Sequence, residues 1–224
     1  LTGPCMIVLK NITKVFRTSG ARKTVARNIN AVFPSDVSVG LLGRNGAGKS
    51  TMLRMISGLS LPTSGEILTN GRISYPVGLA SSMNNDMSGA QNALFVARIY
   101  GADTEEMARF VEDFSQLGPH FHMPVRTYSS GMRQRLSFGI NMALDFDTYL
   151  VDEITSAGDA SFQKKSNDIF LNRIGSRAAI YVSHSTEQIR KICKAGAVLE
   201  NGTLTYYDDV EEAIAHHDRN MKAS

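Results

Sequence analysis

The chain has 224 residues, of which 42% are hydrophobic and 20% charged, a composition typical of a globular protein with one sizeable core. The formal net charge is only +3, which without a run of basic residues argues against a nucleic-acid partner. No stretch reaches about 18 apolar residues and no signal peptide is visible, so we expect neither a transmembrane helix nor secretion. Cys5 and Cys193 lie far apart without metal-ligand spacing and are predicted to be reduced thiols in a cytosolic protein.

The first part of the chain predicts strands on both sides of a glycine-rich loop. We expect strands at residues 5–16, 28–33 and 37–42, and a hairpin over 66–75 turned by Asn70-Gly71. Residues 43–51 read Gly-Arg-Asn-Gly-Ala-Gly-Lys-Ser-Thr and match the phosphate-binding pattern G-x-x-x-x-G-K-[ST]. The loop follows a strand and precedes a helix, which is the context that this pattern requires.

The residue types in this loop suit a nucleotide. Glycines let the backbone wrap a phosphate chain, and the amides at the following helix start form an anion cradle. Lys49 is predicted to reach the β- and γ-phosphates of ATP, and the Ser50 hydroxyl to hold Mg²⁺. A plain glycine-rich turn before a core helix is the structural alternative. The predicted ATP-binding residues of the loop are Gly43, Arg44, Asn45, Gly46, Ala47, Gly48, Lys49, Ser50 and Thr51.

The rest of the chain is first helical and then alternates strand and helix. Residues 88–117 are predicted to be helical, with a break at Gly101 and Asp103, and a further helix is expected over 129–146. Strands are then expected at 149–152 and 178–183, helices near 159–174 and 185–194, a hairpin over 197–207 and a helix near 208–220. Such alternation predicts an α/β fold with a parallel core. We expect one domain over 1–224, with a helical subdomain inserted at about 80–146.

An acidic pair ends the strand near residue 150. Leu150 and Val151 are apolar, and Asp152 and Glu153 follow at the carboxyl end, where open α/β sheets bind ligands. Asp152 is predicted to be a carboxylate in the outer coordination shell of magnesium, and Glu153 to orient or polarise the attacking water. A charged strand end that faces solvent is the alternative.

A second candidate anion-binding element begins at residue 128. The segment Tyr-Ser-Ser-Gly-Met-Arg over 128–133 opens a helix with hydroxyls and free amides, which alone would be an ordinary helix cap. In the order phosphate loop, helical insert, Ser-x-Gly helix and acidic strand, the chain resembles the ATP-binding cassette (ABC) ATPases. Their usual signature is Leu-Ser-Gly-Gly-Gln; here Tyr128, Ser130 and Met132 replace Leu, the first Gly and Gln. Ser129 and Gly131, the positions that the family directs at the γ-phosphate, are retained.

The resemblance spans residues 6 to about 215 and implies further roles. Asp159 ends a segment that resembles the D-loop, and His184 resembles the switch histidine that contacts the γ-phosphate. Phe16 falls where the family stacks an aromatic ring on adenine. A structural histidine and a core aromatic are the respective alternatives. Catalysis is thus assigned to Lys49, Glu153 and His184.

One family element departs from its usual form. The family has a glutamine, which contacts metal and water, in the loop that joins the β-core to the helical insert. Residues 76–85 contain none, and Asn84, with the same amide on a shorter side chain, is the best match. A polar loop without nucleotide contact is the alternative.

The resemblance also implies partners. Such ATPases work as head-to-tail dimers in which each ATP lies between the phosphate loop of one chain and the Ser-x-Gly helix of the other. A homodimer with two ATP sites and a separate integral-membrane permease of the ABC-2 type are therefore expected. Met83 and Met87 lie in the segment that would face the permease, with a core role as the alternative.

Several stretches look like the ATPases of capsular polysaccharide export in Gram-negative bacteria: 73–77, 95–101, 128–133 and 145–153. Related O-antigen ATPases often carry an added carbohydrate-binding domain, whereas only about 17 residues follow Tyr207 here, too few for one. The implied function is ATP-driven export of a lipid-linked polysaccharide from the cytoplasmic face of the inner membrane. The alternative is another ABC-2 type exporter, of O-antigen, teichoic acid, a lipid or a drug.

Overall fold

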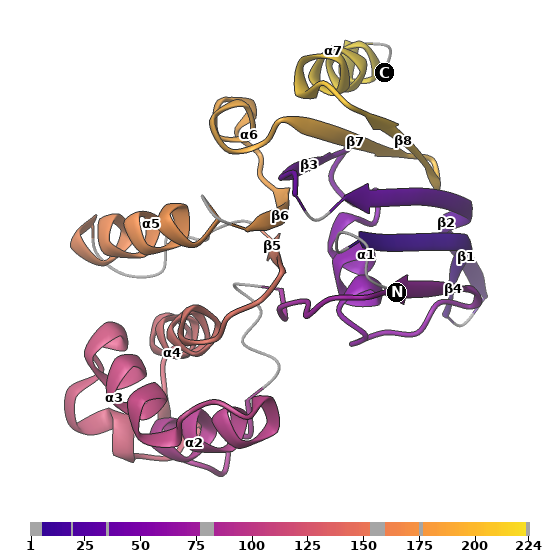
Figure 1. The fold of residues 1–224 in the computed structure, drawn as a ribbon. Helices are drawn as coiled ribbons and strands as arrows, with labels where there is room; N and C mark the ends of the chain where they lie inside the picture. Colours follow the sequence, from indigo (N-terminus) through magenta and orange to yellow (C-terminus); the bar gives the residue numbers. More distant parts are fainter. Residues whose placement is uncertain are drawn as a thin grey trace. The chain divides into compact units, whose positions relative to one another are not determined.

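The computed structural model describes residues 6–18, 20–34, 36–76, 83–152, 160–174 and 177–222. Contacts within the chain divide it into two compact units, and Figure 1 draws their elements as ribbons. The first unit comprises Leu1–Pro76, Phe146–Glu153 and Ile174–Ser224, and the second comprises Val77–Asp145 and Ile154–Arg173.

The first unit contains a three-stranded antiparallel sheet in the order β2-β1-β4. Its strands are β1 (Met6–Thr18), β2 (Ala21–Pro34) and β4 (Ser64–Thr69). Ile7 and Leu9 of β1 are buried while Lys10 is exposed, so the strand alternates between a core face and a solvent face. The two predicted N-terminal strands are therefore confirmed, and the structure joins them as one long hairpin.

The same unit holds a five-stranded sheet in the order β5-β6-β3-β7-β8. The strands β3 (Val39–Leu42), β5 (Thr148–Asp152), β6 (Ala178–Val182) and β7 (Ala195–Glu200) run parallel, and β8 (Thr203–Tyr207) pairs antiparallel with β7. The helices described in this first unit are α1 (Lys49–Ile56), α6 (Thr186–Ile192) and α7 (Val210–Lys222). The parallel core and the C-terminal hairpin are confirmed.

The two sheets share one apolar core. Ile7 and Phe33 of the antiparallel sheet pack in the same buried cluster as Leu41, Leu150 and Ile180 of the parallel strands. Every residue of β3 and β6 is buried, as expected for parallel strands covered on both faces. This common core fixes the hairpin of β1 and β2 relative to the carboxyl ends of β3, β5 and β6.

The predicted hairpin over 66–75 is wrong in its second half. Beyond β4, Ile73 forms a single parallel bridge with Thr148. The Ser74 amide donates to the Thr148 carbonyl at 3.0 Å, and the Ser74 hydroxyl accepts from the Leu150 amide at 2.8 Å. These bonds attach the segment to β5, because the backbone groups of that strand's edge need partners.

The second unit is helical. It contains α2 (Gly89–Tyr100), α3 (Thr104–Ser115), α4 (Ser130–Ala143) and α5 (Ala160–Ile174, assigned to this unit as far as Arg173), with short 3₁₀ turns η2 (Gly118–His122) and η3 (Val125–Thr127). Gly101 ends α2 in the left-handed conformation and Asp103 caps α3, so the predicted break is confirmed. The Phe114 ring packs 5.4 Å from Phe138 and 5.3 Å from Phe162, which ties α3 to α4 and α5.

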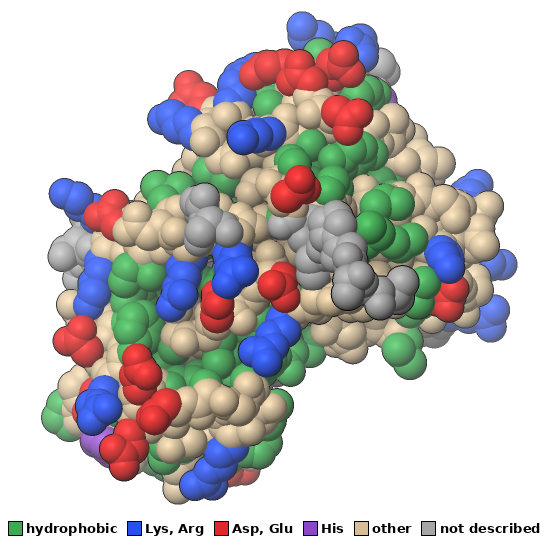
Figure 2. Space-filling model, viewed as in Figure 1, with side chains coloured by type: hydrophobic (Ala, Val, Ile, Leu, Met, Phe, Trp, Pro, Cys, Tyr) green, Lys and Arg blue, Asp and Glu red, His purple; other side chains and the backbone are tan. Residues whose placement is uncertain are grey.

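Figure 2 shows basic and acidic side chains interspersed on the face drawn, without a broad field of one sign. None of the helices formed by the described residues has the length and apolar character that a bilayer crossing needs.

Cys193 provides a test of the first unit's packing. It is 3% exposed, and burial raises the pKa of its thiol to about 12. Because the thiolate is the reactive form, we expect iodoacetamide at about pH 8 to leave Cys193 unmodified in the native protein and to modify it in guanidinium chloride. Peptide mass spectrometry would report the modification site by site. Rapid modification of the native protein would contradict the burial of this side chain.

Candidate active site

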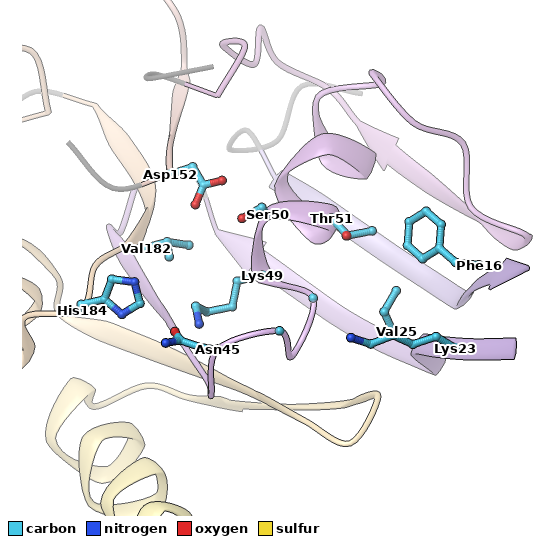
Figure 3. Close-up of a pocket in the computed structure, with 12 residues that line it drawn as sticks. Phe16, Lys23, Val25, Asn45, Lys49, Ser50, Thr51, Asp152, Val182 and His184 are labelled. Carbon is cyan, nitrogen blue, oxygen red and sulfur yellow. The ribbon is translucent and has the colours of Figure 1, made fainter. Parts of the chain in front are cut away.

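A cavity of about 380 Å³ lies in the first unit, at the carboxyl ends of β3, β5 and β6 (Figure 3). This edge of a parallel sheet is where α/β proteins bind ligands, because loops and helix starts converge there. The cavity is lined by Phe16, Lys23, Val25, Asn45, Gly46, Gly48, Lys49, Ser50, Thr51, Asp152, Val182 and His184.

The glycine-rich loop connects β3 to α1 in a backbone conformation that requires glycine. Gly43, Gly46 and Gly48 have φ angles of 152°, 77° and 108°. A Cβ on Gly43 would also overlap the carbonyl oxygen of Leu199 in β7. Gly48 precedes α1 without a side-chain cap, and the first residues of α1 line the cavity, so the positive end of the helix dipole lies at the cavity wall. The loop thus has the form of an anion cradle.

Lys49 lies beneath this loop with a side chain that is only 8% exposed. Its ammonium group donates to the carbonyl oxygens of Gly43 at 2.6 Å and Arg44 at 3.1 Å. These contacts satisfy a nearly buried cation, which would otherwise carry a large desolvation cost. They also hold the positive charge at the cavity wall.

A hydroxyl, a carboxylate and an imidazole gather with Lys49 at one end of the cavity. Figure 3 shows Asp152, Ser50 and His184 at this end, while Phe16 lies at the opposite end beyond Thr51. Asp152 comes from the last position of β5, and His184 follows β6, which pairs with β5 and β3. The sheet therefore brings together residues that are more than a hundred positions apart in the chain.

Oxygen ligands for a hard cation are present at this end, although no group of three acidic, histidine or cysteine side chains forms a cage within the described residues. Mg²⁺ commonly uses one or two protein oxygens and completes its shell with water and phosphate oxygens. Ser50 and Asp152 fit that pattern.

Phe16 is 44% exposed, so its ring is not committed to the core; the Lys14 ammonium lies 5.3 Å from the ring centre, and the exposed part of the ring is available for stacking. Three lining residues were missed from the sequence: Lys23, Val25 and Val182. No spacing in the sequence indicates these residues; Lys23, for example, reaches the cavity through its position opposite Phe16 in the hairpin register.

The Ser-x-Gly segment lies in the second unit. Ser129 caps α4, and its hydroxyl accepts from the Met132 amide at 3.2 Å. Tyr128 is buried, its phenol donates to the His120 carbonyl at 2.6 Å, and burial raises its pKa. A Cβ on Gly131 would meet only the Ser129 hydroxyl, at 4.0 Å, so nothing else described in this chain requires a glycine there.

Some residues that the sequence predicts to contact ATP are absent from the lining of this cavity. Ser129 and Gly131 do not line the cavity, and Glu153 and Asp159 fall outside the described residues.

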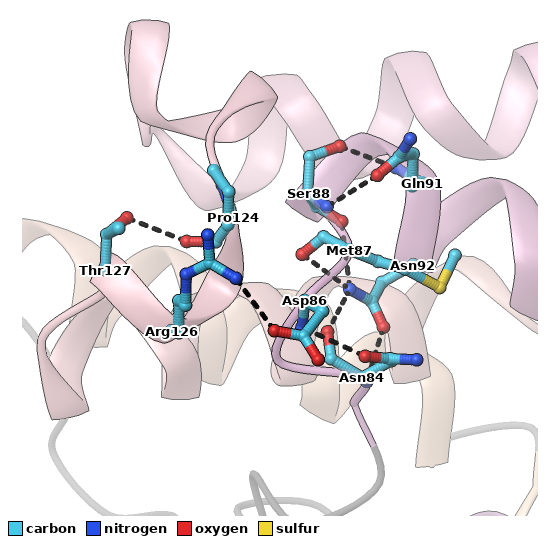
Figure 4. A network of polar contacts seen from close by, with 9 residues as sticks. All are labelled: Asn84, Asp86, Met87, Ser88, Gln91, Asn92, Pro124, Arg126 and Thr127. Atoms are coloured by element: carbon cyan, nitrogen blue, oxygen red, sulfur yellow. Dashed lines mark hydrogen bonds and ion pairs between the residues drawn. The ribbon is translucent and has the colours of Figure 1, made fainter.

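Asn84 lies in a network of polar contacts within the second unit (Figure 4). Its backbone N–H donates to the side-chain oxygen of Asn92 at 2.9 Å, and its own side-chain oxygen accepts from the backbone N–H of Asp86 at 2.9 Å. The side-chain oxygen thus supports the loop, and contact with a metal stays a prediction.

Comparison with known proteins agrees with this site. Residues 26–156 match the family model described as ABC transporter. The chain is 46% identical over 219 residues to the polysialic acid transport ATP-binding protein KpsT of Escherichia coli, covering 96% of this chain and all of KpsT. It is 36% identical to the capsule polysaccharide export ATP-binding protein CtrD of Neisseria meningitidis serogroup B, covering 95% of this chain and 98% of CtrD.

The fold is similar to that of a solved dimeric ATP-binding cassette in a post-hydrolysis state, bound to ADP and Pi. The TM-score is 0.73 at 20% identity, over 91% of this chain and 98% of that one. The family match covers more than half of the chain and contains the phosphate loop, the Ser-x-Gly helix and the acidic strand. The chain therefore belongs to the ABC transporter family, as an ATPase that couples ATP hydrolysis to transport.

Proposed function

We propose that the chain is the nucleotide-binding subunit of an exporter that moves a capsular or related lipid-linked polysaccharide across the bacterial inner membrane. The observation that carries this proposal is the identity to polysaccharide-transport relatives along nearly their whole length. On this proposal the subunit binds a membrane permease at the cytoplasmic face. Export of another polymer, such as teichoic acid or O-antigen, is the second candidate.

ATP is proposed to lie along the cavity with its base on Phe16 and its γ-phosphate near His184. The loop amides and the start of α1 would bind the phosphates, and Lys49 would exchange its two carbonyl contacts for β- and γ-phosphate oxygens. Ser50 and Asp152 would hold Mg²⁺, which when bound neutralises phosphate charge. Glu153 would take up or orient the proton of the attacking water, and His184 would donate to the γ-phosphate.

A second copy of the chain is proposed to complete each site. The support is Gly131, which stands in the first turn of α4 with open space where a Cβ would project. A glycine there costs helix stability, and its use is explained if a phosphate from outside the chain approaches closely. Ser129 would offer its hydroxyl and the helix start to that phosphate. Two chains arranged head to tail would thus bind two ATP molecules.

The permease is proposed to contact the second unit along the loop 83–88 and α2. Phe95 is 53% exposed and Ile99 is 60% exposed, and four residues apart on a helix they share one face. Met87 precedes this helix, and its backbone carbonyl accepts from the Val125 amide at 2.9 Å. This bond holds the loop in place beside α2. The exposed apolar side chains of α2 are available to a partner.

The phosphate-loop assignment predicts the effect of Lys49→Ala. We expect ATP hydrolysis to fall at least about a hundredfold, because the charge that stabilises the transferred phosphoryl group is lost. The measurement is ATP binding by calorimetry and phosphate release. Lys191→Ala, which removes an exposed lysine of α6 outside the cavity, is the matched control. Near-normal turnover of Lys49→Ala would contradict the ATP site.

The shared site predicts a trapped dimer for Glu153→Gln. We expect this variant to bind ATP, to hydrolyse it about a hundredfold or more slowly, and to elute as a dimer with ATP and Mg²⁺ but not with ADP. Light scattering after size exclusion measures the mass. Glu187→Gln, on α6, serves as control. A variant that stays monomeric with ATP would argue against sites shared between two chains.

The docking proposal predicts that Phe95→Asp with Ile99→Asp separates the subunit from its permease. We expect co-purification from membranes in mild detergent to be lost, because two charges would replace the exposed apolar contacts. ATP binding by the isolated subunit should stay within about twofold. Leu171→Asp changes an exposed leucine elsewhere in the second unit, on α5, and the variant should retain the permease. Equal retention of the permease by both proteins would contradict this surface, and the lipid-linked glycan that co-purifies would separate capsule export from the second candidate.

A further inference from the structure

Lys23 occupies a position in the cavity that none of the predicted nucleotide contacts fills. In the register of β1 and β2 it stands directly opposite Phe16, so both side chains project from the same face of the hairpin. The next pair toward the turn, Arg17 opposite Arg22, projects from the other face. Figure 3 shows the Lys23 side chain extending from β2 toward the glycine-rich loop.

The loop is close to the Lys23 ammonium group. A Cβ built on Gly46 would lie 3.8 Å from that nitrogen, so the charge is directed at the middle of the loop. Lys23 also lines a second cavity of about 230 Å³, together with Arg44 and Glu200. In Figure 3 the Lys23 side chain ends between Phe16, at one end of the main cavity, and Lys49 and His184, at the other.

Within the part of the chain that the structure describes, the charge of Lys23 takes part in no ion pair, although Glu200 shares the second cavity. Lys14 provides the contrast, because its ammonium donates to the Ser60 hydroxyl at 3.0 Å and to the Leu61 carbonyl at 2.6 Å. Lys14 is thus engaged in packing the first unit, whereas Lys23 is an exposed cation at an anion cradle.

We propose that Lys23 is a nucleotide-binding residue that pairs with the α- and β-phosphate oxygens of ATP and ADP. This inference rests on the proposed ATP site, since the base on Phe16 and the γ-phosphate near Lys49 leave the α- and β-phosphates at the level of Gly46. An ammonium within reach of phosphate oxygens forms charge-assisted hydrogen bonds, which are stronger than neutral ones. Arg17 and Arg22 add to the positive potential of the hairpin, although they face away from the cavity.

The test replaces Lys23 by methionine, which keeps the length of the side chain and removes its charge. We expect the Kd values of ATP and ADP and the KM for ATP to rise by the same factor, about five- to twentyfold, with kcat within about twofold. The ATP affinity of the variant should also depend less on salt, because one ionic contact is gone. Lys23→Arg, which keeps the charge, should recover most of the affinity.

Arg22→Met is the matched control, because it removes the same charge from the neighbouring position on the opposite face. Its Kd values should stay within about twofold of the unmodified protein. A loss of similar size in Arg22→Met would assign the effect to the general field of the hairpin and overturn the proposal. Unchanged Kd values in Lys23→Met, or a loss for ATP without one for ADP, would overturn it as well.

The same titrations separate this inference from the proposed function. If Lys49→Ala abolishes ATP binding while Lys23→Met binds ATP and ADP normally, the ATP site stands and the role of Lys23 fails. If the unmodified protein itself does not bind ATP, the proposed function fails, and the Lys23 assignment fails with it.

Discussion

The contact on which the rest of the site depends is the one between the glycine-rich loop and the end of β7. Gly43 lies so close to the carbonyl of Leu199 that no side chain fits, and this packing turns the chain sharply as it leaves β3. Lys49 then ties the turn from within by its bonds to the Gly43 and Arg44 carbonyls. The packing of Gly43 against Leu199 does not depend on Lys49, so the cradle keeps this contact when Lys49 turns to a phosphate.

The parallel sheet extends this arrangement to the groups that act on the phosphates. β3 lies between β6 and β7, and β5 lies beyond β6, so the loop, His184 and Asp152 emerge side by side. Their alignment follows from the register of the strands, which the buried apolar core stabilises.

In the second unit, backbone hydrogen bonds join the loop before α2 to the segment before α4. The Val125 amide donates to the Met87 carbonyl and the Arg126 amide to the Asn85 carbonyl, each at 2.9 Å, and Arg126 pairs with Asp86 at 2.8 Å. Tyr128 continues the connection. Its buried phenol lies so close to Gly89 that a side chain at position 89 would have no room. The proposed permease surface and the Ser129 helix start are therefore parts of one hydrogen-bonded assembly.

How far the sequence predicts the site differs from residue to residue. The loop from Gly43 to Thr51 could be predicted because its chemistry is local: glycine conformations, a lysine and a hydroxyl at fixed spacing before a helix. Lys23 could not be predicted in this way, since an exposed lysine in a strand has no spacing that distinguishes it. Only its pairing opposite Phe16 and its distance from Gly46 bring it to the cavity.

The same distinction holds for the fold. By itself the sequence determined the alternation of strands and helices, the caps at Gly101 and Asp103, and the family, because these depend on short patterns and on residue types. Tertiary structure alone decided that residues 72–74 join β5 instead of folding back on β4, that α5 packs with Phe114, and that the Phe16 ring faces the cavity. Each of these outcomes depends on contacts between residues far apart in the chain, whose free energy no local pattern contains.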